Sequence, residues 1–171
     1  MSTNNAGTVG LGNLGVAQQG AVWEFPSVGS CVAVCVLDPE ARVAGVAHAM
    51  LPNSRGNTAT ELPAKYVDQA IAALLDRLIA NGADPSRMLA AYCGCADLLT
   101  GPQPYLPLSI GSCNGSAVRT GLEHSGIRCM GSHVGGHHRR SVRFDSHTGE
   151  VRVKAGLRPE VVICNLLEEA A

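Results

Sequence analysis

Aromatic side chains are scarce in this chain of 171 residues, in which Phe, Trp and Tyr make up only 4%. The hydrophobic fraction is nevertheless 46%, so the core has to be built mainly from Ala, Val, Leu and Ile. A strong charge of either sign is also missing, because the formal net charge is −1. We therefore expect neither nucleic acid nor membrane insertion, and a protein or a small molecule is the expected target.

Signals for export and for membrane insertion are absent as well. No run approaches the roughly 18 uninterrupted apolar residues of a spanning helix, and the N-terminus lacks the basic region of a signal peptide. The seven cysteines are an odd number, which argues against a disulfide framework. A reducing compartment with free thiols, the cytoplasm, is the expected location. No glycine run matches a phosphate-binding loop.

Apolar spacing predicts most of the elements. Residues 1–18 are rich in Gly, Asn, Gln and Thr and are interpreted as a flexible leader or an edge segment, and 19–171 as a single domain. Strands are expected at 21–37, with a bend at Gly29, at 42–50 and at 87–96, and in alternation with turns from 127–136 onward. The repeat of apolar pairs every four residues predicts a helix over 66–79, and a weaker helix is expected at 112–124. A hairpin is expected around Thr148-Gly149, and a loop at 100–109.

This order of elements, strands, helix, strand, helix and strands, indicates the α+β class. We expect a layered sandwich of mostly antiparallel or mixed sheets with helices on the outer faces.

Two residues in the valine-rich region have the chemistry of a nucleophile and a base. Cys31 follows Gly29 and Ser30 at the predicted bend, where the backbone N–H groups of Ser30 and Cys31 would be placed to bind an oxyanion. His48 lies in an apolar strand, where an unpaired imidazole would cost about 1–3 kcal/mol. A thiol is one partner that it could have, and the two would exchange a proton to give a thiolate and an imidazolium. Taken alone, a buried cysteine or a histidine on an apolar strand is more often a structural residue of the core than a catalytic one.

The residues around this pair resemble a known family. The segment VGSCVAVCVLD at 28–38 and the segment GVAHAMLP at 45–52 are similar to those of the CheD family, the chemoreceptor glutamine deamidases. Further matches run in order to about residue 155: Lys65-Tyr66, Ile110-Gly111 with Asn114, Gly135-Gly136, Arg140-Ser141-Val142 and Thr148-Gly149.

The resemblance implies a CheD-like domain in which Cys31 attacks the carboxamide carbon of a protein glutamine and His48 acts as the base. The implied substrates are the cytoplasmic helices of chemoreceptors, and a CheC-type phosphatase is an implied partner. No cofactor and no metal are implied.

The chain departs from the family pattern at two places. The family has a catalytic threonine six residues before its cysteine, where this chain has Phe25, and a stretch similar to Ala-Gly-Gly-Ala is replaced by YCGCA at 92–96. If residues 25, 27, 29 and 31 shared one face of a strand, Ser27 would offer a replacement hydroxyl. We therefore include Ser27 with Cys31 and His48 as a candidate catalytic residue.

Two other interpretations remain open on sequence alone. One is a catalytically weak CheD-like binding module that regulates a CheC-type phosphatase. The other is a structural zinc protein using Cys93 and Cys95 with Cys113, Cys129 or the histidines at 133, 137 and 138, although the C-x-C spacing is not that of a recognised zinc ligand pair. The basic cluster at 137–140 is interpreted as a solvated strand end that would help to dock an acidic helix.

Overall fold

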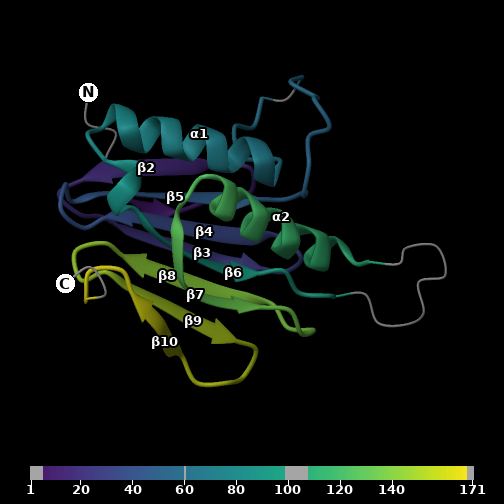
Figure 1. Cartoon of the computed structure of the whole chain (residues 1–171). Helices are drawn as coiled ribbons and strands as arrows, with labels where there is room; N and C mark the ends of the chain where they lie inside the picture. Colours follow the sequence, from purple (N-terminus) through teal and green to yellow (C-terminus); the bar gives the residue numbers. More distant parts are fainter. Residues whose placement is uncertain (1–5, 60, 99–107, 169–171) are drawn as a thin grey trace.

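The structure, a computed structural model, describes residues 6–59, 61–98 and 108–168 and has three layers (Figure 1). Its strands are β1 (Gly7–Thr8), β2 (Leu14–Gln18), β3 (Val22–Val28), β4 (Val32–Asp38), β5 (Val43–Ala49), β6 (Leu89–Gly94), β7 (Arg128–Val134), β8 (Arg140–Asp145), β9 (Glu150–Ala155) and β10 (Val161–Asn165). Its helices are α1 (Val67–Ala80), a 3₁₀ turn (Pro85–Arg87) and α2 (Ile110–His124).

The strands form two mixed five-stranded sheets that face each other. One sheet has the order β1-β3-β8-β9-β10 and the other has the order β2-β5-β4-β6-β7. Both α-helices pack on the outer face of the second sheet, with α1 over β5 and β2 and α2 over β6 and β7. The predicted α+β sandwich is confirmed, with the addition that the two helices share one outer face.

The α1 helix follows the four-residue apolar repeat of its sequence. Its buried positions include Ala70, Ile71, Leu74 and Leu78, which pack against the outer face of the sheet. Glycine at position 45 of β5 permits this contact, because a Cβ there would lie 2.8 Å from Leu74 Cδ1. The predicted helix is therefore confirmed within a residue at each end.

A second core fills the space between the two sheets. Every residue of β4 and β5 is buried, and alternate β4 side chains point toward this core. Trp23 and Phe144 stack here with ring centroids 5.7 Å apart, although aromatics are few. The valine-rich run thus forms the central strand of the molecule, covered on both faces.

The flexible leader predicted for residues 1–18 is wrong from Gly7 onward, and the edge segment is the correct alternative. β1 pairs with β3, and β2 pairs with β5 over five residues, from Leu14 opposite Ala47 to Gln18 opposite Val43. Four of the five β2 residues are buried. Residues 1–5, and most of the loop predicted at 100–109, lie outside the described residues.

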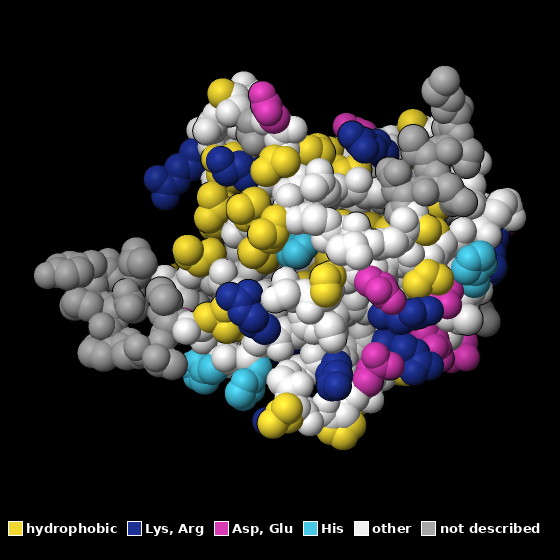
Figure 2. Space-filling model, turned by 180° about the vertical axis from the view of Figure 1, so that it is seen from behind, with side chains coloured by type: hydrophobic (Ala, Val, Ile, Leu, Met, Phe, Trp, Pro, Cys, Tyr) yellow, Lys and Arg dark blue, Asp and Glu magenta, His cyan; other side chains and the backbone are white. Residues whose placement is uncertain are grey.

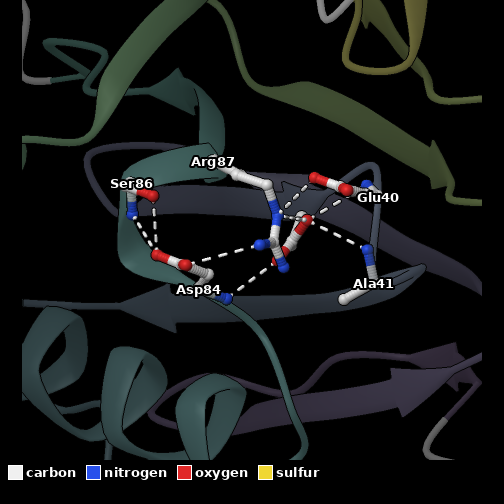
Figure 3. Close-up of polar contacts among 6 residues, drawn as sticks. Glu40, Ala41, Asp84, Ser86 and Arg87 are labelled. Carbon is white, nitrogen blue, oxygen red and sulfur yellow. Dashed lines mark hydrogen bonds and ion pairs between the residues drawn. The ribbon is translucent and has the colours of Figure 1, made fainter.

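A network of polar groups closes the turn that follows β4. The buried carboxylate of Asp38 accepts hydrogen bonds from the backbone amides of Ala41 and Asp84 and from Arg87, whose Nη2 lies 2.7 Å from Asp38 Oδ2. Figure 3 shows Arg87 reaching between Asp84 and Glu40 in this network. Burial alone would raise the pKa of Asp38, but these hydrogen bonds hold it below its usual value.

Charged side chains lie on the outer face of the first sheet. Arg143 pairs with Glu24 at 3.0 Å, and Arg152 pairs with Glu150 at 2.7 Å. Figure 2 shows basic and acidic side chains interleaved on this flank of the molecule. In the part of the chain that the structure describes, no helix is both long and apolar enough to cross a membrane.

Candidate active site

Cys31 and His48 lie on the same side of their sheet. Cys31 closes the bend that joins β3 to β4, and Ala33, two residues later, lies opposite His48 on β5. Because side chains alternate along a strand, Cys31 and His48 both face the core between the sheets, as diagonal neighbours whose Cα atoms are typically about 7–8 Å apart. Cys31 packs at the edge of that core and is only partly buried.

Residues 9–13 wrap around His48 through their backbone. The backbone N–H of His48 donates to Asn13 O at 2.9 Å, and the backbone N–H of Gly12 donates to His48 O at 2.8 Å. The imidazole Nδ1 lies 3.1 Å from Val9 O. A carbonyl oxygen can only accept a hydrogen bond, so Nδ1 carries the proton of the neutral ring and Nε2 is the basic nitrogen.

The rest of the imidazole is enclosed by the core. Phe25 packs edge-on against it, with ring centroids 5.4 Å apart. Nε2 is buried and has no hydrogen-bond partner among the described residues. Burial lowers the pKa of His48, and the bond to Val9 opposes this effect. His48 is thus a neutral base with one uncommitted nitrogen.

The pKa of the Cys31 thiol is shifted in the direction that favours its neutral form. Burial raises its pKa, whereas its own backbone N–H and the positive charge of Arg139 lower it to a smaller extent. A raised thiol pKa and a lowered imidazole pKa both disfavour the thiolate–imidazolium pair that the sequence suggested. Both shifts favour a protonated thiol beside a neutral imidazole.

Hydrogen bonds fix the peptide planes of the bend before β4. Gly29 O accepts from the backbone N–H of Ala96 at 2.9 Å, and Ser30 O accepts from Asn114 Nδ2 at 2.8 Å. In a trans peptide the N–H points away from the carbonyl that precedes it. The N–H groups of Ser30 and Cys31 therefore point away from β6 and α2, and that of Cys31 faces its own thiol.

Close packing behind the bend leaves no room for a side chain at position 94. Gly94 has a φ of 124°, and a Cβ there would collide with the carbonyl oxygen of Cys31. The next residue, Cys95, donates its backbone N–H to that oxygen at 2.8 Å. The altered stretch at 92–96 thus retains a glycine that packs directly behind Cys31.

Ser27 does not join this site. The pairing of β3 with β8 slips between Phe25 and Val28, so both of these residues are buried and the two-residue alternation is broken. Ser27 is exposed, and its hydroxyl accepts from Arg139 Nη1 at 3.3 Å. The premise that residues 25, 27, 29 and 31 share a face is wrong, because the bulge turns Ser27 outward.

The basic cluster at 137–140 divides into two parts. Arg140 is buried, against the expectation of a solvated strand end, and it donates to His133 Nδ1 and to the carbonyls of His138 and Gly135. Arg139 is exposed and lies close to Gly29. The hydrogen bonds of Arg140 hold the turn before β8 together, and Arg139 in that turn lies near Cys31.

The remaining cysteines do not form a metal site in the described part of the chain. Within it, no group of three or more His, Cys, Asp or Glu side chains is arranged to hold a metal ion. Cys35 and Cys93 are fully buried and their thiol pKa values are raised well above the ordinary one, chiefly by burial. Burial likewise raises the pKa of Cys95 to about 12. These thiols have the character of core residues.

Two contributors to the site carried no recognisable sequence signal. The Val9 carbonyl is a backbone group in a glycine-rich segment, and for Phe25 the sequence indicates only that the family threonine is absent there. Asn114 did carry a signal, because it belongs to one of the matched segments, and its side chain donates to Ser30 O in the bend before Cys31.

Comparison with known proteins identifies a family for this chain. A family model described as CheD chemotactic sensory transduction matches residues 50–155. The chain is 36% identical over 146 residues to "Chemoreceptor glutamine deamidase CheD" of Thermotoga maritima, a match that spans 85% of this chain and 89% of that protein.

Two further relatives are each named "Probable chemoreceptor glutamine deamidase CheD". The protein from Desulfitobacterium hafniense is 34% identical over 94% of this chain and 99% of its own length. The protein from Archaeoglobus fulgidus is 38% identical over 85% of this chain and 90% of its own length. The similarity therefore extends over nearly the whole of each protein.

Proposed function

This chain belongs to the CheD family, and on that premise we propose that it is a protein-glutamine deamidase that converts glutamine side chains of chemoreceptor cytoplasmic helices to glutamate. The observation that carries the mechanism is the hydrogen bond from His48 Nδ1 to Val9 O. It leaves Nε2 unprotonated on the face of the sheet that Cys31 also occupies.

The reaction begins when the Cys31 sulfur attacks the carboxamide carbon of the glutamine. His48 Nε2 accepts the thiol proton as the C–S bond forms, which agrees with a resting pair that is neutral. The carbonyl oxygen becomes an oxyanion, and the N–H groups of Ser30 and Cys31 are the donors that bind it.

The intermediate then collapses to a thioester. His48 returns the proton to the departing nitrogen, the C–N bond breaks and ammonia leaves. Water attacks the thioester carbon and gives a proton to His48, which passes it to the sulfur as the C–S bond breaks. The products are glutamate and the free Cys31 thiol.

The Val9 carbonyl takes the orienting role for which Ser27 was a candidate. Phe25 cannot accept a hydrogen bond from an imidazole, but it packs on the ring and shields it from water. A main-chain acceptor together with an aromatic wall can fix both the tautomer and the ring plane. The loss of the family threonine is therefore compatible with activity.

The test is ammonia release from a recombinant chemoreceptor cytoplasmic domain, with mass spectrometry to locate the new glutamate. We expect Cys31→Ala and His48→Ala each to reduce turnover at least about 10³-fold, as for other paired nucleophiles and bases. Full turnover by Cys31→Ala would exclude the mechanism. Cys113→Ala, which changes a cysteine on α2, is the matched control and should keep its activity.

The same assay distinguishes the deamidase from the alternative, a catalytically weak binding module. Such a module would bind a CheC-type phosphatase and release no ammonia, whether or not Cys31 is present. A CheC-type phosphatase also remains a proposed partner of the active enzyme, and the cytoplasm is the proposed location.

A further inference from the structure

Asn114 is a fully buried polar residue in the first turns of α2. Its side-chain Nδ2 donates to Ser30 O at 2.8 Å and to Met50 O at 3.0 Å. Ser30 immediately precedes the nucleophile, and Met50 follows the base by two residues. One amide group therefore joins the two segments that carry the reacting side chains.

The orientation of this amide is determined by its partners. Both are carbonyl oxygens, which accept hydrogen bonds and cannot donate them, so the nitrogen has to face them. Each of the two amide protons of Asn114 is therefore donated to one of these carbonyls. Its Oδ1 is buried without a partner among the described residues, which typically costs about 1–3 kcal/mol.

Packing of α2 does not by itself explain a buried asparagine. Val118 and Leu122 bury the inward face of the helix, and Gly111 lies so close to Ala96 O that a Cβ would be 2.5 Å away. An apolar residue at 114 would avoid the cost of the unpaired oxygen. What only an amide supplies is a pair of donors to the two carbonyls.

We propose that Asn114 is a positioning residue that sets the Ser30–Cys31 peptide plane, so that the Cys31 N–H faces the reacting carbonyl oxygen, and holds this plane in register with the His48 strand. The inference rests on the proposed function of Cys31 and His48. The hydrogen bond to Ser30 O fixes one side of the peptide, and the Cys31 N–H on the other side then points toward its own thiol.

The experiment compares Asn114→Ala and Asn114→Ser with Ser146→Ala. Ser146 is a matched control because it is buried and bonds both backbone groups of Ala21, at the far end of β3 from the bend. We expect kcat for ammonia release to fall roughly 10- to 100-fold in the Asn114 variants with little change in KM, because a misdirected oxyanion donor acts only in the transition state. Ser146→Ala should keep its kcat even if its melting temperature falls.

Iodoacetamide alkylation of Cys31, followed against pH in the absence of substrate, gives a second measurement. The Cys31 N–H lowers the pKa of the thiol, so its misalignment should move the alkylation midpoint to higher pH in the Asn114 variants and not in Ser146→Ala. This result does not depend on deamidase activity. Inactivity of the wild-type protein would therefore contradict the proposed function and leave this measurement intact.

Three outcomes overturn the proposal. The first is a folded Asn114 variant with unchanged kcat and an unchanged alkylation midpoint. The second is a loss that appears only in KM. The third is failure of both variants to fold where Ser146→Ala folds, because that would make the amide an element of the architecture alone.

Discussion

The two ends of β4 bury polar groups in opposite ways. At the Asp38 end, the buried carboxylate accepts hydrogen bonds from Nε and Nη2 of Arg87. It also accepts from the backbone amides of Glu40, Ala41 and Asp84. At the Cys31 end, His48 Nε2 and Asn114 Oδ1 are buried without partners among the described residues.

The same physical effect has opposite outcomes at these two ends. Burial raises the pKa of Asp38 and of Cys31 alike, but hydrogen bonds outweigh it at Asp38 and do not outweigh it at Cys31. Satisfied groups stabilise the fold, whereas unsatisfied ones cost free energy: His48 Nε2 stays available as the proposed base, and the unpaired Asn114 Oδ1 accompanies an Nδ2 that donates to two carbonyls. One strand thus separates a stabilising polar network at one end from the proposed active site at the other.

The largest effect on stability is expected from Asp38→Asn. An amide in place of the carboxylate leaves Arg87 without its buried partner, and we expect a loss of about 2 kcal/mol in the free energy of unfolding, reduced from a fully buried pair because Arg87 is partly exposed. Urea denaturation measures this loss. Turnover at the Cys31 end should be unchanged under folding conditions, and a parallel fall in kcat would show that the two ends are coupled.

Acid should remove the difference between Asp38→Asn and the wild type. The pKa of Asp38 is lower in the folded protein than in the unfolded chain, where it is about 3.9. Its stabilising effect is therefore present above that pH and is lost as the pH falls through the folded value. Unfolding curves between pH 7 and pH 2.5 should converge only at the acid end.

A smaller effect is expected from Arg139→Gln, which acts on the reactive end alone. The positive charge of Arg139 lowers the pKa of Cys31, so its removal should move the alkylation midpoint further above the ordinary thiol value of about 8.5. Because Arg139 is exposed, we expect only a few-fold slower alkylation at pH 7, and salt near 1 M should reduce the difference. Arg143→Gln is the control, since Arg143 pairs with Glu24 instead.

The smallest effect is expected from Ser27→Ala. The exposed hydroxyl contacts Arg139 and not His48, so turnover should stay within about twofold of the wild type, as for surface changes in general. A tenfold loss of kcat would return the orienting role to Ser27 and would contradict the assignment of that role to the Val9 carbonyl.

Local patterns in the sequence were sufficient for much of the fold. The four-residue repeat from Tyr66 to Ile79 identified α1, and Thr148-Gly149 identified the hairpin of β8 and β9. Glycine at 29 marked the bend that precedes Cys31. In each case the residues that specify the element lie within or beside it, so tertiary context was not needed.

The parts that sequence reasoning missed depend on contacts between distant segments. The glycine-rich stretch at 7–18 has little intrinsic strand preference and becomes β-structure by pairing with β3 and β5. The bulge that turns Ser27 outward arises from the register of β3 against β8. The acceptor for His48 is a main-chain oxygen, which every residue carries, so no residue type distinguished it.

Because the acceptor of the His48 imidazole is a main-chain oxygen, side-chain substitutions cannot remove it. Replacing Val9 by another amino acid keeps its carbonyl, so side-chain scanning through residues 9–13 would pass over the group that selects the His48 tautomer. Only a change in the path of the backbone can move that oxygen away from His48, such as a deletion within residues 9–13 or a displacement of β1, which precedes them. The tautomer of the proposed base therefore depends on where residues 9–13 lie and not on which side chains they carry.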